Sequence, residues 1–225
     1  MSIHPLITEI RSAYRSAANA ENALAMRNYM KSEMLFHGVK SAMRKEINSI
    51  VFRKFKIISF AEYECVIREL WATEYREERY SAISFARKHK KFQTLDALPI
   101  YRMMIETGAW WDFVDEIAAH LIGNMLQTFP AEMKEELKRW IKDDNLWIRR
   151  TAILAQLRFK KDTDHEMLFD FCRQCLDEKT FWIRKAIGWA LRQYSKDEPD
   201  RVREFFNKYR DRMSTVTLKE VVKYI

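Results

Sequence analysis

The sequence predicts an all-α protein built from stacked helical repeats, and three observations lead to this fold class. The 225-residue chain contains only 4 glycines and 4 prolines, too few for a protein rich in hairpins and tight turns. Helical periodicity of apolar residues recurs along nearly the whole sequence, and no alternating strand pattern competes with it. A sequence block also repeats in the second half of the chain. Together these observations indicate a curved α-solenoid.

Apolar stripes at helical spacing locate individual helices. The segment 62–71 is the clearest case, with apolar side chains at Tyr63, Val66, Ile67, Leu70 and Trp71. The segment 111–125 carries a second stripe through Val114, Ile117, Ala118, Leu121 and Met125. Polar or Pro/Gly breaks fall near residues 37–38, 93–96, 107–108, 129–130, 161–164 and 198–200. We therefore expect roughly ten or more helices with short connections, so that neighbours pack antiparallel.

The internal repeat has a period close to that of known helical solenoids. Residues 147–150 (WIRR) recur as residues 182–185 (WIRK), 35 residues later. The helical block 152–158 recurs as 186–192 with one residue lost in between. Such a period, with two helices per unit, is typical of solenoids whose inner helices line a concave surface. The alternative is an ordinary helical bundle with accidental similarity. We treat residues 1–225 as a single domain.

The charge balance favours acidic partners. The chain has a formal net charge of +8, although a basic balance alone is weak evidence for nucleic-acid binding. If the repeats form a groove, basic residues at regular intervals along it would follow a phosphate backbone. The alternative is that they face solvent and pair with Asp143, Asp144 or Glu178. The candidates for such a basic groove are Arg44, Lys45, Arg149, Arg150, Arg184, Lys185 and Arg192.

The remaining composition argues against several other classes. Only 3 cysteines occur, and the pair Cys172 and Cys175 lies in an apolar helical pattern, which predicts buried thiols. The 5 histidines lack the spacing of a metal site, so we expect no metal and no cofactor. From the residues given we expect no targeting segment and no membrane-spanning run. We expect a cytoplasmic, monomeric protein.

An aromatic face beside a carboxylate is the most informative candidate site. Trp111 and Asp115 are four positions apart, so a helix places them one above the other. Trp110 and Trp189 also stand apart from the apolar stripes, whereas Trp71, Trp140 and Trp147 fall on them. Core packing remains the alternative for Trp111 and Trp189. Gly188 directly before Trp189 suggests that something approaches this backbone closely. An indole face and a fixed carboxylate suit chemistry through a developing cation, such as cleavage of a glycosidic bond in DNA.

Several motifs in this order resemble the AlkD family, bacterial alkylpurine DNA glycosylases built from HEAT-like repeats. The resemblance runs from about residue 4 to about residue 224. The motifs are residues 29–31 (YMK), 67–71 (IRELW), 110–115 (WWDFVD), 144–154 (DNLWIRRTAIL) and 185–192 (KAIGWALR). One departure concerns residues 41–44, Ser-Ala-Met-Arg, where the family often has Thr-Pro-x-Arg. Ser41 is nevertheless expected to cap the helix that follows.

This resemblance implies roles for individual residues. Asp115 matches the catalytic aspartate, and Trp111 and Trp189 match two tryptophans that flank the lesion. Arg150 matches an arginine near the lesion phosphates, and Tyr29 matches a tyrosine beside the site. The full set of residues expected to bind DNA is Tyr29, Ser41, Arg44, Lys45, Trp110, Arg149, Arg150, Arg184, Lys185 and Arg192.

The resemblance also implies an activity. The expected substrate is double-stranded DNA containing positively charged N3- or N7-alkylated purines, whose glycosidic bond is hydrolysed without flipping the base into a pocket. The alternative function is a non-catalytic helical-repeat protein that binds nucleic acid or an acidic partner. Asp115 discriminates between the two, because a carboxylate in a phosphate-binding groove weakens binding and a pure binder has no use for it.

Overall fold

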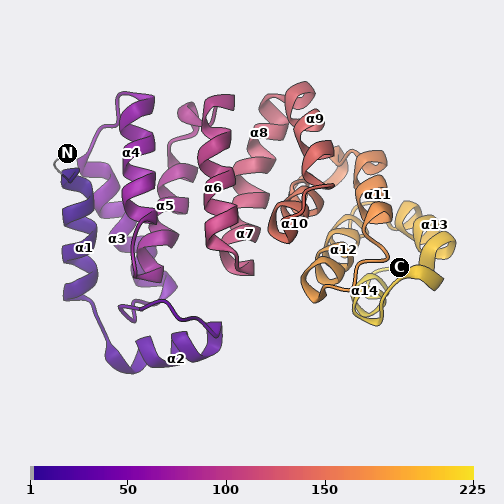
Figure 1. Cartoon of the computed structure of the whole chain (residues 1–225), viewed down its shortest axis with the longest axis horizontal. Helices are drawn as coiled ribbons and strands as arrows, with labels where there is room; N and C mark the ends of the chain where they lie inside the picture. The colour runs from indigo at the N-terminus through magenta and orange to yellow at the C-terminus, as the bar shows by residue number, and fades with distance from the viewer. Residues whose placement is uncertain (1–2) are drawn as a thin grey trace. The chain divides into compact units, whose positions relative to one another are not determined.

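A computed structural model of the chain describes residues 3–225 and confirms the predicted all-α class. Among these residues the only strand-like pairing is an isolated parallel bridge between Leu35 and Tyr75. The chain packs as two units, residues 1–100 and 101–225, and the boundary falls inside helix α6 (Leu98–Gly108) (Figure 1).

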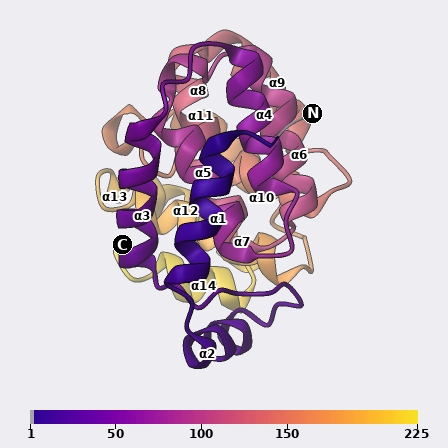
Figure 2. The ribbon, with the colours of Figure 1, turned by 90° about the vertical axis from the view of Figure 1, so that its left-hand side faces the viewer.

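Unit 1 contains two helix pairs that pack into two layers. Its elements are α1 (Pro5–Ser16), α2 (Ala20–Met30), α3 (Ser41–Lys54), α4 (Phe60–Trp71), α5 (Arg76–Lys88) and the 3₁₀ turns η1 (Lys90–Phe92) and η2 (Leu95–Ala97). Helix α1 packs against α3 and α4, and α5 packs against α3 and α4. Helix α2 lies beyond the ends of the other helices of this unit (Figure 1, Figure 2). The predicted helix at 62–71 is confirmed as part of α4, whose apolar stripe is buried.

Unit 2 is a row of four stacked helical segments with further helices beside it. Its elements after α6 are α7 (Trp111–Ile117), the π-helical turn η3 (Ala118–Ile122), α8 (Gly123–Thr128), α9 (Pro130–Trp140), α10 (Leu146–Leu154), the 3₁₀ turn η4 (Lys160–Asp162), α11 (His165–Gln174), α12 (Phe181–Tyr194), α13 (Pro199–Tyr209), the 3₁₀ turn η5 (Arg210–Arg212) and α14 (Thr215–Val221). Helix α10 packs between α7 and α12, and α14 packs on the far side of α12. We call α7, α10, α12 and α14 the stacked row. Helices α9 and α11 pack against α10, and α13 packs against α12.

The sequence repeat corresponds to equivalent structural positions in the stacked row. Trp147 and Trp182 are the second residues of α10 and α12, and their ring centroids lie 5.6 Å apart. Arg149 donates from Nη1 to the carbonyl of Asp143 at 2.6 Å, six residues earlier. Arg184 makes the matching bond from Nε to the carbonyl of Glu178 at 2.7 Å. The repeated motif therefore encodes a helix start whose arginine holds the preceding turn, and the predicted helical-repeat architecture is confirmed.

Other packing expectations are also confirmed. Trp71, Trp140 and Trp147 are buried, as their places on apolar stripes predicted. Cys172 and Cys175 are free and buried, as the apolar pattern of α11 indicated. No helix among the described residues is long and apolar enough to cross a membrane.

Candidate functional site

A buried ion pair between Asp115 and Arg150 forms the centre of the candidate site. Arg150 donates from Nε to Oδ1 of Asp115 at 2.7 Å and from Nη2 to Oδ2 at 2.8 Å. The Asp115 side chain is 11% exposed and that of Arg150 only 3%. Arg150 also donates from Nη1 to the backbone carbonyl of Trp182. The arginine is thus fixed on both sides, and it holds the carboxylate in one orientation with both oxygens engaged.

The electrostatics of Asp115 combine two opposing effects. Burial raises its pKa above the ordinary aspartate value, and the charges of Asp112 and Glu116 act in the same direction. The hydrogen bonds and charge of Arg150 lower the pKa but do not outweigh burial. The charge and the two hydrogen bonds of the Arg150 guanidinium nevertheless favour the carboxylate form over the neutral acid. Asp115 is therefore an ionised group with raised proton affinity.

Local sequence explains how α7 presents this carboxylate. Helix α7 begins at Trp111, directly after Ala109 with φ 38° and Trp110 in extended conformation. Asp115 lies one turn further on, so the predicted stacking of Trp111 and Asp115 on one helix face is met. The π-helical turn η3 follows at Ala118, and such turns recur at functional sites.

Trp110, Trp147 and Trp182 form an aromatic cluster, and one of them, Trp182, lies against the guanidinium of Arg150. Trp182 lies edge to face with Trp110, with ring centroids 5.3 Å apart, and Trp110 and Trp147 are 6.3 Å apart. The Arg150 guanidinium carbon lies 5.9 Å from the centroid of the Trp182 ring. Trp182 was not among the predicted site residues, although its equivalence to Trp147 in the repeat was a usable signal. Its ring and carbonyl both help to place Arg150.

One face of α12 links this aromatic cluster to basic residues. Trp182, Lys185, Trp189 and Arg192 follow one another at intervals of three or four positions, so they share a face. All four are partly exposed. Trp111 is also partly exposed, so neither Trp111 nor Trp189 is a fully buried core residue. The two predicted catalytic tryptophans therefore retain accessible surface, and their contact with a nucleotide stays a prediction.

The close neighbour that Gly188 predicted is helix α14. A Cβ atom at Gly188 would lie 2.8 Å from Cβ of Glu220 and 3.1 Å from the carbonyl oxygen of Thr217. The glycine thus permits close contact between two helices of the stacked row. Lys185 and Arg192, on either side of Gly188, both form ion pairs with Glu220.

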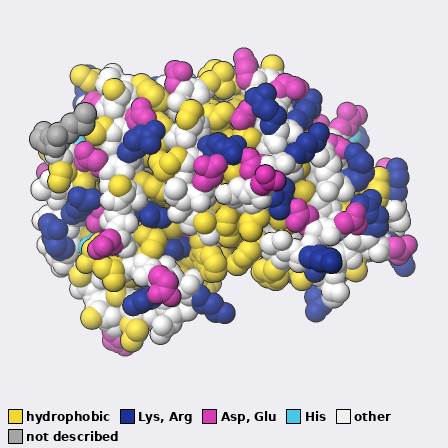
Figure 3. Space-filling model, viewed as in Figure 1, with side chains coloured by type: hydrophobic (Ala, Val, Ile, Leu, Met, Phe, Trp, Pro, Cys, Tyr) yellow, Lys and Arg dark blue, Asp and Glu magenta, His cyan; other side chains and the backbone are white. Residues whose placement is uncertain are grey.

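The predicted groove arginines of unit 2 engage acidic partners or backbone. Arg149 pairs with Glu178, with Nε 2.9 Å from Oε1, and it also donates to the carbonyl of Asp144. The Arg149–Glu178 pair is one of the pairings that the alternative to a basic groove named, whereas Arg150 and Arg192 pair with Asp115 and Glu220. In the part of unit 2 that Figure 3 displays, lysine and arginine side chains are interspersed with aspartate and glutamate. The basic groove stays a prediction.

Four predicted DNA-binding residues belong to unit 1. Tyr29, in the last turn of α2, is 75% exposed, and Ser41 and Lys45 are also exposed. The Arg44 guanidinium carbon lies 4.2 Å from the centroid of the Tyr80 ring. The expected cap by Ser41 is wrong: α3 starts at Ser41 itself, Lys40 occupies the capping position, and no side chain caps this end.

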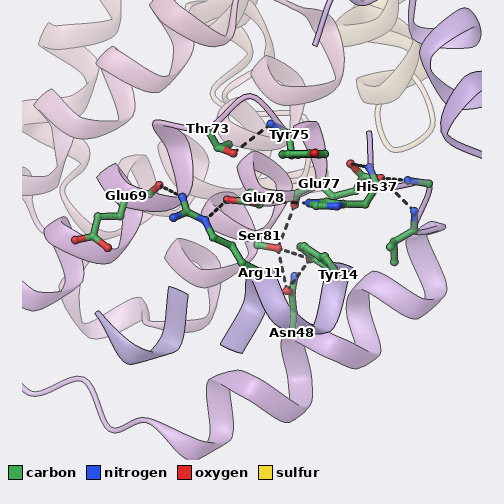
Figure 4. Close-up of polar contacts among 12 residues, drawn as sticks. Arg11, Tyr14, His37, Asn48, Glu69, Thr73, Tyr75, Glu77, Glu78 and Ser81 are labelled. Carbon is green, nitrogen blue, oxygen red and sulfur yellow. Dashed lines mark hydrogen bonds and ion pairs between the residues drawn. The ribbon is translucent and has the colours of Figure 1, made fainter. Parts of the chain in front are cut away.

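A buried carboxylate fixes the connection between Tyr29 and Ser41. Glu77 accepts backbone N–H bonds from His37 at 3.1 Å on Oε2, and from Gly38 at 2.9 Å and Val39 at 3.1 Å on Oε1 (Figure 4). Gly38 has φ 82°, and a Cβ there would lie 2.0 Å from the carbonyl oxygen of Asn19. Glu77 had no signal in the sequence, because its partners are backbone groups about 40 residues away.

A second polar cluster lies beside this carboxylate in unit 1. The Tyr14 hydroxyl donates to Oδ1 of Asn48 at 3.0 Å, and Ser81 donates to the same oxygen at 2.9 Å (Figure 4). Arg11 donates from Nε to Glu78 at 2.9 Å. These bonds join α1, α3 and α5, so they hold the helices that flank the connection. Among residues 3–225 no cluster of three or more His, Cys, Asp or Glu side chains has the arrangement of a metal site.

The fold and the site together define a helical-repeat protein whose stacked row carries a buried acid–arginine pair beside partly exposed tryptophans. The family model described as "DNA alkylation repair enzyme" matches residues 10–225. The chain therefore belongs to the DNA alkylation repair enzyme family, and its function lies in the repair of alkylated DNA.

Solved structures support this assignment. A protein described as a predicted DNA alkylation repair enzyme from Enterococcus faecalis has 27% sequence identity and a TM-score of 0.85, over 92% of this chain and 96% of that chain. AlkD2 from Streptococcus mutans has 17% identity and a TM-score of 0.64, over 80% of this chain and 89% of that chain, which shows likeness of fold alone. A comparison with curated protein sequences gave no match.

Proposed function

We propose that the protein is a DNA glycosylase that hydrolyses the N-glycosidic bond of cationic N3- and N7-alkylated purines in duplex DNA. The observation that carries this proposal is the Asp115 carboxylate, which is largely buried and held on both oxygens by Arg150. A bidentate pair of this kind fixes the direction of the negative charge before substrate arrives. Trp111, one helical turn away, adds an aromatic surface next to that charge.

The chemistry follows from the charge of the substrate. An N3- or N7-alkylpurine is cationic, so when the bond from the sugar carbon to the base nitrogen breaks, both electrons go to the base and it leaves neutral. The sugar becomes an oxocarbenium-like cation. Asp115 stabilises that cation by its charge, and indole faces such as those of Trp111 and Trp189 contribute about 0.5–2 kcal/mol each by cation–π contact.

Water then completes the reaction. A water molecule adds to the sugar carbon and loses a proton, leaving an abasic site and free base. Each carboxylate oxygen of Asp115 has a second lone pair beyond the one that Arg150 uses, so it can accept a hydrogen bond from this water. The raised pKa of Asp115 makes it a better proton acceptor than an ordinary aspartate. One carboxylate suffices, because the leaving base needs no acid; glycosidases, whose leaving groups are poorer, use two.

Substrate selectivity follows from the same argument. The enzyme grips the DNA backbone and relies on the lability of the charged base, so the lesion stays in or near the stack. Neutral lesions such as uracil should therefore be poor substrates, because their base departs with a negative charge and the Asp115 carboxylate has no proton to donate to it.

The test is release of 7-methylguanine from duplex DNA by the wild type and by Asp115→Asn. We expect the variant to lose at least about 10²-fold in single-turnover rate, the scale seen when a preorganised electrostatic group is removed. Glu116→Gln is the matched control: it removes the same charge from the exposed neighbouring position and should retain excision. Salt-sensitive DNA binding without base release by the wild type would instead favour the non-catalytic binding protein.

A further inference from the structure

Three basic side chains converge on one buried carboxylate at α14. Glu220 is 7% exposed at its side chain, and its Oε1 lies 2.5 Å from Nζ of Lys185 and 3.1 Å from Nζ of Lys223. Its Oε2 lies 2.6 Å from Nη1 of Arg192. Lys185 and Arg192 come from α12, whereas Lys223 follows the end of α14. We call Lys185, Arg192, Glu220 and Lys223 the Glu220 cluster.

The Glu220 cluster occupies repeat positions equivalent to the candidate catalytic pair. Lys185 and Glu220 are 35 residues apart, the same separation as Asp115 and Arg150. Arg150 and Lys185 are themselves the equivalent fourth residues of the two repeated motifs. Adjacent helices of the stacked row are thus joined by an acid–base pair at one repeated position, once at α7 and α10 and once at α12 and α14.

The two pairs differ in their charge balance. Asp115 meets one cation, whereas Glu220 meets three, so the Glu220 cluster keeps a net positive charge. Lys185 and Lys223 each donate one hydrogen bond to Glu220, and Arg192 forms an ion pair with it. An ammonium has three donors and a guanidinium has five, so Glu220 leaves other donors of these side chains unused. The three basic side chains are between 26% and 47% exposed, so they remain accessible to an anion. The carboxylate reduces their mutual repulsion and fixes their positions.

The Glu220 cluster also lies beside a predicted catalytic residue. Lys185 and Arg192 flank Trp189 on the same face of α12, four positions before it and three after it. The close contact at Gly188 brings α14, and with it Glu220 and Lys223, directly against this stretch of α12. An aromatic surface with cations on either side matches the alternation of sugar or base with phosphate along a nucleic-acid strand.

We propose that Lys185, Arg192 and Lys223, assembled by Glu220, form a clamp for a DNA backbone phosphate next to Trp189. Lys223 is the residue that this adds to the predicted DNA contacts, and Glu220 is a positioning residue that does not itself touch DNA. The inference rests on the proposed action on DNA, but it is independent of base excision.

The test measures binding of an undamaged DNA duplex across a salt series for Lys223→Met and Lys219→Met. Both variants remove one positive charge from the α14 region, but Lys219 is exposed and makes no ion pair with Glu220. Each phosphate contact steepens the slope of the logarithm of the binding constant against the logarithm of the salt concentration by about 0.9. We expect Lys223→Met to lower the slope by about that amount and Lys219→Met to leave it nearly unchanged.

Equal effects of the two variants would overturn the clamp, because they would show only a loss of net charge. An unchanged slope for Lys223→Met would also overturn it. Lys185→Met provides a second readout, with the same expected loss of about 0.9. Release of 7-methylguanine, measured in parallel, separates the two proposals. A wild type that binds with the expected slopes but releases no base retains the clamp and refutes the glycosylase.

Discussion

Replacing Arg150 by methionine should damage the protein through the charge that it leaves behind. The substitution keeps much of the side-chain volume but removes both hydrogen bonds to Asp115, whose side chain is 11% exposed. A buried charge without its partner costs about 3–5 kcal/mol. Asp115→Asn has a comparable expected cost, because it leaves a guanidinium that is only 3% exposed and cannot lose its proton. The double variant leaves no unpaired charge, so the two costs should not add.

Denaturant unfolding of the four proteins in this double-mutant cycle gives the coupling directly. We expect a coupling free energy of about 3 kcal/mol or more, at or above the top of the range for residues in contact, because the unpaired charge that causes each single cost is absent from the double variant. Single-variant effects that add to within about 0.5 kcal/mol would refute the reasoning, because independent sites behave in that way. The Trp182 carbonyl that Arg150 also contacts is lost equally in both Arg150 variants, so it cancels in the cycle.

The pH dependence of Arg150→Met provides a second check of the same pair. Burial already raises the pKa of Asp115, and Arg150 opposes that rise. Without Arg150 the pKa should rise further, so the carboxylate forms only at higher pH. The acid limb of the excision profile should therefore move to higher pH. The free energy of unfolding should depend on pH in a related way. Relative to wild type, Arg150→Met should lose most of this free energy at pH values above the raised pKa of Asp115, where the unpaired carboxylate is charged. An acid limb that does not move would contradict this account.

Two further predictions concern α14. Gly188→Ala should destabilise the protein by about 1–2 kcal/mol, because overpacking against Glu220 outweighs the gain in helix propensity, and a rise in melting temperature would contradict this. Glu220→Gln should destabilise it by about 1–2 kcal/mol at neutral pH, because the amide cannot balance the cations. Burial alone would raise the pKa of Glu220, but Lys185, Lys223 and Arg192 together lower it. The stability it contributes is therefore present above the ordinary glutamate pKa and lost as pH falls through the lowered value. Denaturation at pH 7 and about pH 3 should show the difference from wild type shrinking in acid.

The helical architecture was predictable because its signals are local. The apolar stripe over 62–71 arises from side chains within one helix, and the predicted helix is observed as part of α4. The repeated block at 147–150 and 182–185 recurs because each copy builds the same helix start, with an arginine bonded to a carbonyl six residues earlier. Buried cysteines in α11 follow from the same periodicity. These features need no knowledge of distant contacts.

The pairing of side chains was not predictable, because it depends on contacts between repeats. The bonds from Arg150 to Asp115 and to the Trp182 carbonyl had no signal in the sequence, and the place of Arg150 near DNA phosphates stays a prediction. The neighbour of Gly188 is a helix whose own sequence gives no sign of this contact. The expected Ser41 cap failed because a helix start depends on backbone conformation one residue earlier, at Lys40.

The repeat also explains how equivalent positions of the stacked row hold two carboxylates, Asp115 and Glu220, whose pKa values shift in opposite directions. Asp115, Arg150, Lys185 and Glu220 succeed one another at 35-residue intervals along the stacked row. At one end Asp115 has a single cation and two acidic neighbours, so burial prevails and its pKa is raised. At the other end Glu220 has three cations, which outweigh burial and lower its pKa. The first environment favours accepting a proton from water, whereas the second keeps a permanent charge that orders basic side chains. If the number of paired cations were exchanged between Asp115 and Glu220, the directions of their pKa shifts should therefore be exchanged as well. The number of cations around each carboxylate thus determines whether its position suits the candidate catalytic role or the candidate phosphate-binding role.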